Sequence, residues 1–260
     1  MRLRIAIDGP SGAGKSSVAK AIARSLDLAY LDTGAMYRAI GLKVKQRGVD
    51  PHDDQAVAEI LADTDLTVSF TGEGQQIYLD GEALGEEIRA NDIAQWASDV
   101  STLPSCRRQL VAWQRECAMD HNVVIDGRDI ASVVLPEAEV KIYLTADLHE
   151  RAKRRWLELQ SKQPDLTLEE VEGALQARDA QDQGRENSPL RCLPEHICID
   201  STDMTFEEVV NRILRLVQKQ NPAYIAELRL ERERRRRHYY LDLPGLSVPT
   251  LGEVDDDEDL

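Results

Sequence analysis

The chain has 260 residues, of which 42% are hydrophobic and 30% charged, a composition typical of one soluble α/β domain with insertions. No apolar run approaches the roughly 20 residues that span a bilayer, and the first predicted strand begins almost at once. We therefore expect no membrane anchor and no signal peptide, and a cytoplasmic protein. The net charge of −15 argues against broad binding of nucleic acid.

The segment AIDGPSGAGKSSVAKAI predicts a phosphate-binding turn between a strand and a helix. The preceding LRIAI is apolar and favours a strand, whereas SSVAKAIARSL has apolar residues at helical spacing. A glycine-rich turn at a helix N-terminus directs backbone N–H groups toward an anion. Lys15 can reach the terminal phosphates of a nucleoside triphosphate, and the Ser16 hydroxyl can bind Mg²⁺. The predicted triphosphate site comprises Gly9, Pro10, Ser11, Gly12, Ala13, Gly14, Lys15, Ser16 and Ser17.

Further apolar segments predict the rest of the core. HNVVIDGRD, AEVKIYLTA and HICIDST each contain a short buried strand, and helical stretches separate the strands along the chain. This alternation predicts a parallel sheet with helices on both faces. DLTVSFTGEGQQIYLDGEALGEEI instead predicts a small antiparallel insertion over about residues 63–88, with turns at Gly72, Gly74 and Asp80-Gly81.

The second half of the chain carries two charged helical regions. The arginine-rich segment from LHERAKRRW to DQGRE contains no predicted strand, and we interpret residues 148–190 as a helical lid. We take residues 1–221 as the main domain. Residues 222–260 form a charged extension in which AYIAELRLERERRRRHYY predicts a helix and the acidic end is expected to be disordered.

The cysteines Cys106, Cys117, Cys192 and Cys198 show no metal-binding spacing, so we expect reduced thiols.

Four clusters of arginine, hydroxyl and carboxyl side chains are candidates for an acceptor site beside the triphosphate. They contain Thr33 and Arg38, then Ser98 and Arg107, then Asp126, Arg128 and Asp129, and finally Arg178, Asp182 and Arg185. The third cluster favours function most strongly, because charges at the end of a buried strand are costly without a partner or ligand. In the simplest alternatives Arg38 is a surface charge, and Arg178 and Asp182 form an i,i+4 pair worth about 0.3–0.5 kcal/mol.

Taken in series, these motifs resemble bacterial cytidylate kinases. The resemblance rests on GPSGAGKSS, LDTGAMYRA, IDGRDIASVV, KIYLTAD with RAKRRWLELQ, RDAQDQGRENSPL and IDST, which follow in this order over about residues 3–217. It implies the P-loop nucleoside monophosphate kinase fold, in which the antiparallel insertion helps to bind the monophosphate. It also implies ATP-dependent phosphorylation of CMP and dCMP with Mg²⁺. RCLPEHICID departs from the Ala/Asp-containing stretch usual in that family.

The resemblance also assigns roles by position. It places Thr33, Arg38, Arg128 and Arg185 near the acceptor phosphate, Arg178 and Asp182 near the ribose, and Ser98, Arg107 and Asp129 near the base, with Asp126 also in the CMP site. Lys15, Arg128 and Arg185 are the expected catalytic residues, and Ser16 is the expected metal ligand. We expect a monomer whose partners are its nucleotide substrates, with no nucleic-acid or membrane partner.

The residues match cytosine better than uracil. The carboxylate of Asp129 can accept a hydrogen bond from the cytosine amino group, whereas the O4 atom of uracil would face it with repulsion. Two alternatives remain open from the sequence. One is another small-acceptor P-loop kinase, of the shikimate or gluconate type, and the other is a non-enzymatic switch that binds a nucleoside triphosphate.

Overall fold

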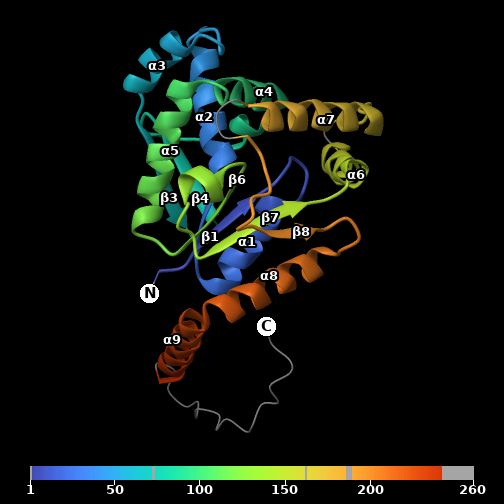
Figure 1. The fold of residues 1–260 in the computed structure, drawn as a ribbon. Helices are drawn as coiled ribbons and strands as arrows, with labels where there is room; N and C mark the ends of the chain where they lie inside the picture. The colour runs from blue at the N-terminus through green and yellow to red at the C-terminus, as the bar shows by residue number, and fades with distance from the viewer. Residues whose placement is uncertain (1, 72–73, 162, 186–188, 242–260) are drawn as a thin grey trace.

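The computed structural model describes residues 2–71, 74–161, 163–185 and 189–241. Its centre is a five-stranded sheet with the strand order β2-β6-β1-β7-β8. All pairs of neighbouring strands are parallel. The strands are β1 (Arg4–Asp8), β2 (Ala29–Asp32), β6 (Val123–Gly127), β7 (Val140–Thr145) and β8 (Ile197–Asp200). The predicted parallel sheet is thus confirmed, and Figure 1 shows it between layers of helices.

Each face of the sheet builds its own apolar core. Along β1, Ile5 and Ile7 point into one core and Ala6 into the other, as the two-residue period of a strand requires. The first core is closed by α1 (Lys15–Leu26), α8 (Phe206–Gln220) and the start of α9 (Pro222–Leu241). The second is closed by α2 (Thr33–Gln46), α3 (Asp54–Ala62), α5 (Pro104–Met119) and η2 (Ile130–Val134). The prediction of helices on both faces is confirmed.

The antiparallel insertion is also confirmed, as a sheet in the order β3-β4-β5. Its strands are β3 (Leu66–Thr71), β4 (Gly74–Leu79) and β5 (Glu82–Ala83). Asp80 and Gly81 both have positive φ, 52° and 84°, and make the predicted turn between β4 and β5. Of the other predicted turn residues, Gly72 lies outside the described part of the chain.

The side-chain amide of Gln75 joins this insertion to the end of β2. The Asp32 N–H donates to Gln75 Oε1 at 2.8 Å, and Gln75 Nε2 donates to the Asp32 carbonyl at 3.2 Å. The chain then continues through η1 (Glu86–Arg89) to α4 (Asn91–Val100), which packs along α2. The insertion therefore flanks the edge of the sheet at which β2 ends.

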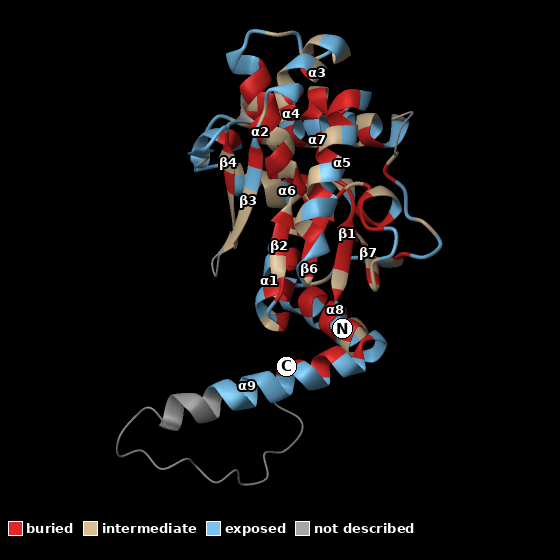
Figure 2. Cartoon of the chain, turned by 90° about the vertical axis from the view of Figure 1, so that its left-hand side faces the viewer, coloured by how far each residue is buried: buried red, intermediate tan, exposed pale blue. Residues whose placement is uncertain are grey.

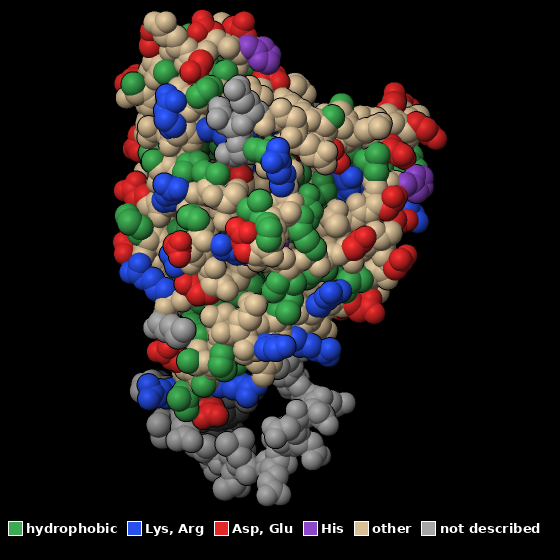
Figure 3. Space-filling model, in the orientation of Figure 1, with side chains coloured by type: hydrophobic (Ala, Val, Ile, Leu, Met, Phe, Trp, Pro, Cys, Tyr) green, Lys and Arg blue, Asp and Glu red, His purple; other side chains and the backbone are tan. Residues whose placement is uncertain are grey.

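The predicted helical lid is a pair of helices, α6 (Leu148–Leu159) and α7 (Leu168–Gly184), which lies beside the sheet (Figure 1). The pair has a small apolar cluster of its own, built around Ala152, Val171 and Leu175. Thr167 and Glu170 form a capping box that begins α7. Acidic side chains gather at the outer end of this pair on the face drawn in Figure 3.

The cysteine expectation is wrong for one pair. Cys192 and Cys198 form a disulfide, whereas Cys106 and Cys117 are free. The loop that precedes β8 folds back on itself and brings together two sulfur atoms six residues apart in sequence. The lack of metal-binding spacing therefore did not show that these two cysteines are reduced thiols.

The start of the charged extension belongs to the core. Tyr224, Ile225 and Leu228 of α9 are buried among residues of α1 and α8, and the Tyr224 hydroxyl donates to the Leu26 carbonyl at 2.9 Å. Further along α9, Leu230 is 55% exposed. Figure 2 shows the change from a buried to an exposed helix. The helix is thus confirmed, while the acidic end at residues 242–260 lies outside the described residues. None of the helices in the described ranges combines the length and apolar character needed to cross a membrane.

This packing predicts different costs for two leucines on the same helix. Leu228→Ala is expected to lower the free energy of unfolding by about 2–4 kcal/mol, because it leaves a cavity among buried side chains. The matched control, Leu230→Ala, should change it by no more than about 0.5 kcal/mol. Denaturant unfolding of the full chain measures both. Equal effects of the two substitutions would show that α9 does not dock on the core.

Candidate active site

The turn between β1 and α1 has the geometry of an anion-binding loop. Gly9 has φ 148°, and a side chain there would collide with the carbonyl oxygen of Leu144 in β7. Gly14, with φ 82°, is the N-cap of α1. Both positions therefore need glycine, one for close approach and the other for a left-handed backbone. The free N–H groups at the start of α1 give this loop a positive electrostatic character.

Lys15 lies inside this loop rather than in solvent. It is 6% exposed, and its Nζ donates to the Pro10 carbonyl at 2.7 Å. Burial, reinforced by the nearby Arg128, lowers the pKa of Lys15 to about 7. The carboxylates of Asp126 and Asp182 oppose this shift without cancelling it. The lysine charge is therefore only partly compensated within the protein.

Ser16 and Asp126 form an oxygen pair at the base of the same loop. Ser16 Oγ donates to Asp126 Oδ2 at 2.9 Å, and the Tyr30 hydroxyl donates to Asp126 Oδ1 at 2.8 Å. Burial raises the pKa of Asp126 to about 6, Asp32 adds to the shift, and Lys15 opposes it. Hydroxyl and carboxylate oxygens are the ligands that Mg²⁺ takes in proteins, so this donor set fits that ion.

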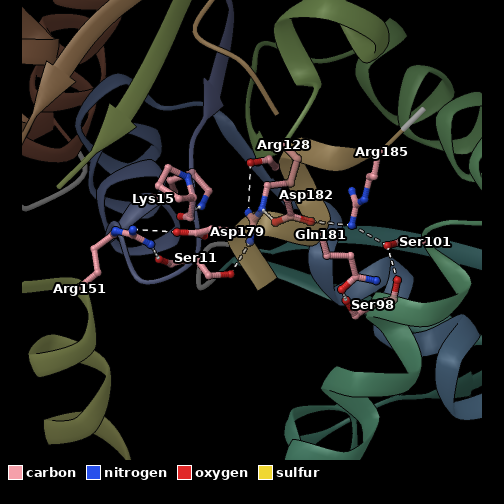
Figure 4. A network of polar contacts seen from close by, with 12 residues as sticks. Ser11, Lys15, Ser98, Ser101, Arg128, Arg151, Asp179, Gln181, Asp182 and Arg185 are labelled. Carbon is pink, nitrogen blue, oxygen red and sulfur yellow. Dashed lines mark hydrogen bonds and ion pairs between the residues drawn. The ribbon is translucent and has the colours of Figure 1, made fainter. Parts of the chain in front are cut away.

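Asp182 on α7 is a carboxylate that lies between two of the predicted site arginines, Arg128 and Arg185 (Figure 4). Its Oδ2 accepts from Arg128 Nε at 2.7 Å, and its Oδ1 lies 2.6 Å from Arg185 Nη2. Burial acts to raise the pKa of Asp182, but Arg128 and Arg185 outweigh it, and the pKa falls below its usual value. The carboxylate is therefore ionised and shared between two guanidinium groups.

Arg178 does not make the i,i+4 pair that its spacing allows. No hydrogen bond or ion pair of its side chain occurs among the described residues, and its Nε is buried without a partner. Burial and the charge of Arg128 lower the pKa of Arg178 to about 10. A half-buried arginine whose Nε has no partner is suited to an anionic ligand.

Ser11 in the loop after β1 connects the two halves of the site. Arg128 Nη2 donates to Ser11 Oγ at 2.6 Å, and Arg151 Nη1 donates to the Ser11 carbonyl at 2.9 Å. Arg151 also pairs with Asp179 of α7 at 2.7 Å. The loop and the helical pair α6–α7 are thus connected by charged side chains, as Figure 4 shows.

Two further contacts connect α7 to α4 across the site. Ser98 Oγ donates to Gln181 Oε1 at 2.9 Å, and Arg185 Nη2 donates to Ser101 Oγ at 2.9 Å. Gln181 and Ser101 were not among the candidates, because neutral side chains in polar helices carry no distinctive signal. Ser98 was a predicted base contact, and its hydroxyl is occupied by Gln181 in this structure.

Arg107 and Asp129, also predicted near the base, form a buried ion pair. Burial raises the pKa of Asp129 although Arg107 opposes the shift. Tyr37 lies within electrostatic range of both, and of Arg185, and burial raises its pKa as well. Tyr37 was not among the predicted site residues, although its position four residues after Thr33 places both on one helix face.

Thr33 and Arg38 lie at the start of α2, where β2 ends. Thr33 is 4% exposed, and its hydroxyl donates to the Asp126 carbonyl at 2.8 Å. Arg38 pairs with Asp32 at 3.0 Å, while its Nε is buried without a partner. Asp32 also caps α2 through the Ala35 N–H. Arg38 is therefore a partly buried side chain and not a plain surface charge.

The predicted acceptor residues converge at the carboxyl edge of the sheet. Electrostatic coupling links Lys15, Asp126, Arg128, Arg178 and Asp182, and a second group contains Arg107, Asp129 and Arg185. Ligands of parallel α/β sheets bind at this edge. The arrangement can hold several phosphate groups close together.

Comparison with known proteins agrees with this geometry. The family model of cytidylate kinase matches residues 5–219. Cytidylate kinase of Caldicellulosiruptor bescii is 45% identical over 218 residues, which cover 84% of this chain and 96% of that protein. That of Caldanaerobacter subterraneus subsp. tengcongensis is 47% identical over 219 residues, again 84% and 96% of the two chains. That of Pediococcus pentosaceus is 42% identical over 217 residues with the same coverage. The chain belongs to the cytidylate kinase family.

Proposed function

We propose that this protein transfers the γ-phosphoryl group of ATP to CMP and dCMP, with Mg²⁺ held in part by Ser16 and Asp126. Activity toward CMP is supported by the family to which the chain belongs. The single observation that carries the site assignment is the half-buried Arg178, whose buried Nε has no partner, beside the Arg128–Asp182–Arg185 cluster. Such a cluster is costly in the free protein and becomes favourable when phosphates enter it.

The proposed triphosphate end is the loop of residues 9–17. Backbone N–H groups at the start of α1 bind the phosphates, and Lys15 exchanges the Pro10 carbonyl for a phosphate oxygen. Arg128 is hydrogen-bonded to Ser11 of this loop, so one cation can serve both substrates. This connection brings the donor phosphates and the acceptor phosphate to one point.

The proposed reaction is a direct transfer. An oxygen of the CMP phosphate attacks the γ-phosphorus of ATP, a new P–O bond forms, and the bond from the γ-phosphorus to the departing ADP oxygen breaks. Lys15, Arg128 and Arg185 stabilise the charge on the transferred group and hold the two oxygens in line. Bound Mg²⁺ supplies further charge neutralisation on the ATP phosphates. The chain's contribution is positioning and electrostatic stabilisation.

The proposed base site is the Arg107–Asp129 pair next to Tyr37. The Asp129 carboxylate accepts from the cytosine amino group, while Arg107 donates to the ring acceptors. Uracil would place a carbonyl oxygen against that carboxylate. Ser98 joins this site when it exchanges Gln181 for the base. We further propose that the protein works as a monomer in the cytoplasm and without a nucleic-acid partner, which its net charge of −15 favours.

An acceptor panel tests the proposed reaction directly. ADP release should depend on CMP or dCMP, be weaker with UMP, and be negligible with shikimate or gluconate. Lys15→Ala should fold normally and lose at least about 10²-fold in kcat, the scale for one charge-stabilising group. Turnover with shikimate or gluconate alone would point to another kinase, and ATP binding without acceptor-dependent turnover would indicate a switch.

Base selection depends on Asp129. Asp129→Asn should raise KM for CMP and narrow the ratio of kcat/KM between CMP and UMP, because an amide can donate to the uracil oxygen. Glu139→Gln is the matched control, since Glu139 also pairs with an arginine, Arg4, but at the opposite edge of the sheet. An unchanged ratio in Asp129→Asn would place the base elsewhere.

ATP binding is expected to take up protons at pH 8. The pKa of Lys15, about 7 in the free protein, leaves the side chain mostly neutral at that pH, and phosphates restore its charge. Asp126, with a pKa of about 6, is already ionised and contributes little. Titration calorimetry in buffers of different ionisation enthalpy should detect up to about one proton. Equal proton uptake by wild type and Lys15→Met would show that Lys15 is not the group that takes up the proton.

A further inference from the structure

His196 is buried against the carboxylate that ends β1. Its side chain and that of Asp8 are each 1% exposed, and His196 Nε2 lies 3.2 Å from Asp8 Oδ2. The Leu193 N–H donates to His196 Nδ1 at 2.8 Å, so the ring proton is assigned to Nε2, which donates to Asp8. The ring of Tyr143 lies beside the His196 ring, with centroids 5.8 Å apart. Histidine, aspartate and backbone thus form one fixed unit.

Asp8 fixes the backbone that follows the acceptor motif. Its Oδ1 accepts from the Ile130 N–H at 2.7 Å, and its Oδ2 accepts from the Ala131 N–H at 2.8 Å. These N–H groups follow Asp129 directly in the chain, and Asp129 pairs with Arg107 in the proposed base site. His196 is therefore the third donor to the carboxylate that holds this motif. A change at His196 can reach Asp129 through Asp8.

The Cys192–Cys198 disulfide encloses His196 in a short loop. Cys198 lies in β8, where it pairs with Tyr143 of β7, so the disulfide ties the other end of the loop to the sheet. Just before this loop, the Leu190 N–H donates to the Asp182 carbonyl at 2.9 Å. The loop therefore connects the acceptor-site end of α7 with the end of β1. Both cysteines are exposed, so a thiol can reach the sulfur pair.

We propose that His196 is a positioning residue for the CMP site and that the Cys192–Cys198 disulfide controls it by redox state. This inference rests on the proposed function. A dithiol reductant opens the loop by thiol–disulfide exchange: the S–S bond breaks, two thiols form on the protein with two electrons and two protons, and the dithiol becomes a disulfide. The freed loop releases His196, Asp8 loses a donor, and the Asp129 motif loses its fixed position.

Opening the disulfide is expected to affect CMP binding more than ATP binding. The Asp8–His196 contact supports the backbone beside Asp129, whereas the ATP loop is held by Arg128 and Arg151 through Ser11. Reduction should therefore weaken CMP binding and leave ATP binding nearly unchanged. In a cytoplasmic protein, disulfides are mostly of the transient, redox-sensing kind, which agrees with a control function.

The test compares oxidised and fully reduced full-length protein, with thiols counted to establish each state. Reduction is expected to raise KM for CMP about two- to tenfold, the scale of one lost hydrogen bond, while KM for ATP stays within about twofold. Calorimetric titration with CMP alone should show the same loss of affinity. Reoxidation should restore the original values.

Variants separate positioning from a structural role. Cys192→Ser combined with Cys198→Ser should behave like the reduced protein and ignore reductant, whereas Cys117→Ser, the control, should keep the response. His196→Ala should raise KM for CMP in the oxidised protein, and reduction should add little to it. His196→Asn, whose amide can donate to Asp8, should recover part of the loss.

The outcomes distinguish this inference from the proposed function. If oxidised wild type phosphorylates CMP and complete reduction changes neither KM nor CMP affinity, the inference is wrong and the function stands. If reduction weakens the binding of CMP and ATP equally and lowers the melting temperature, the disulfide only stabilises the fold and the inference is wrong. If neither redox form acts on CMP, the proposed function fails and the inference fails with it.

Discussion

The site depends on positive charge that the protein's own carboxylates do not neutralise. Asp182 is shared by Arg128 and Arg185, while Arg178 beside it is half-buried and has a buried Nε without a partner. Burial, together with the neighbouring positive charges, lowers the pKa of Arg178 and that of Lys15. The free protein therefore holds an electrostatically unfavourable arrangement. In the proposed site, two nucleotides that must bring their phosphates together would provide the missing negative charge.

The parallel sheet makes this concentration of charge possible. Its carboxyl edge receives the loop after β1, the start of α2 after β2 and the motif after β6, which are far apart in sequence. The helical pair α6–α7 then adds its arginines from the side. Arg128 and Arg151 connect that pair and the loop of residues 9–17 through Ser11, so the proposed donor and acceptor halves are built as one unit (Figure 4).

The sequence predicted the secondary-structure elements well, but it predicted poorly which side chains pair with one another. The glycine turn, the apolar strands and the antiparallel insertion follow from local periodicity and turn chemistry, and all are found. The partner of Asp182 depends on tertiary contacts. Asp182 forms an ion pair with Arg128, and the i,i+4 pair between Asp182 and Arg178 within α7 does not form. The Cys192–Cys198 disulfide depends on how one short loop folds back on itself, and the docking of Tyr224 depends on contacts between distant segments; spacing alone reveals neither.

Thermal unfolding of Arg178→Met, with and without CMP and a non-hydrolysable ATP analogue, tests the central claim most directly. Because the half-buried Arg178 has no partner at its buried Nε, removal of its guanidinium should leave the melting temperature of the free protein unchanged or higher. The rise in melting temperature caused by the two nucleotides should be much smaller than in wild type. A free protein that is strongly destabilised, yet gains as much from the nucleotides as wild type does, would contradict the account.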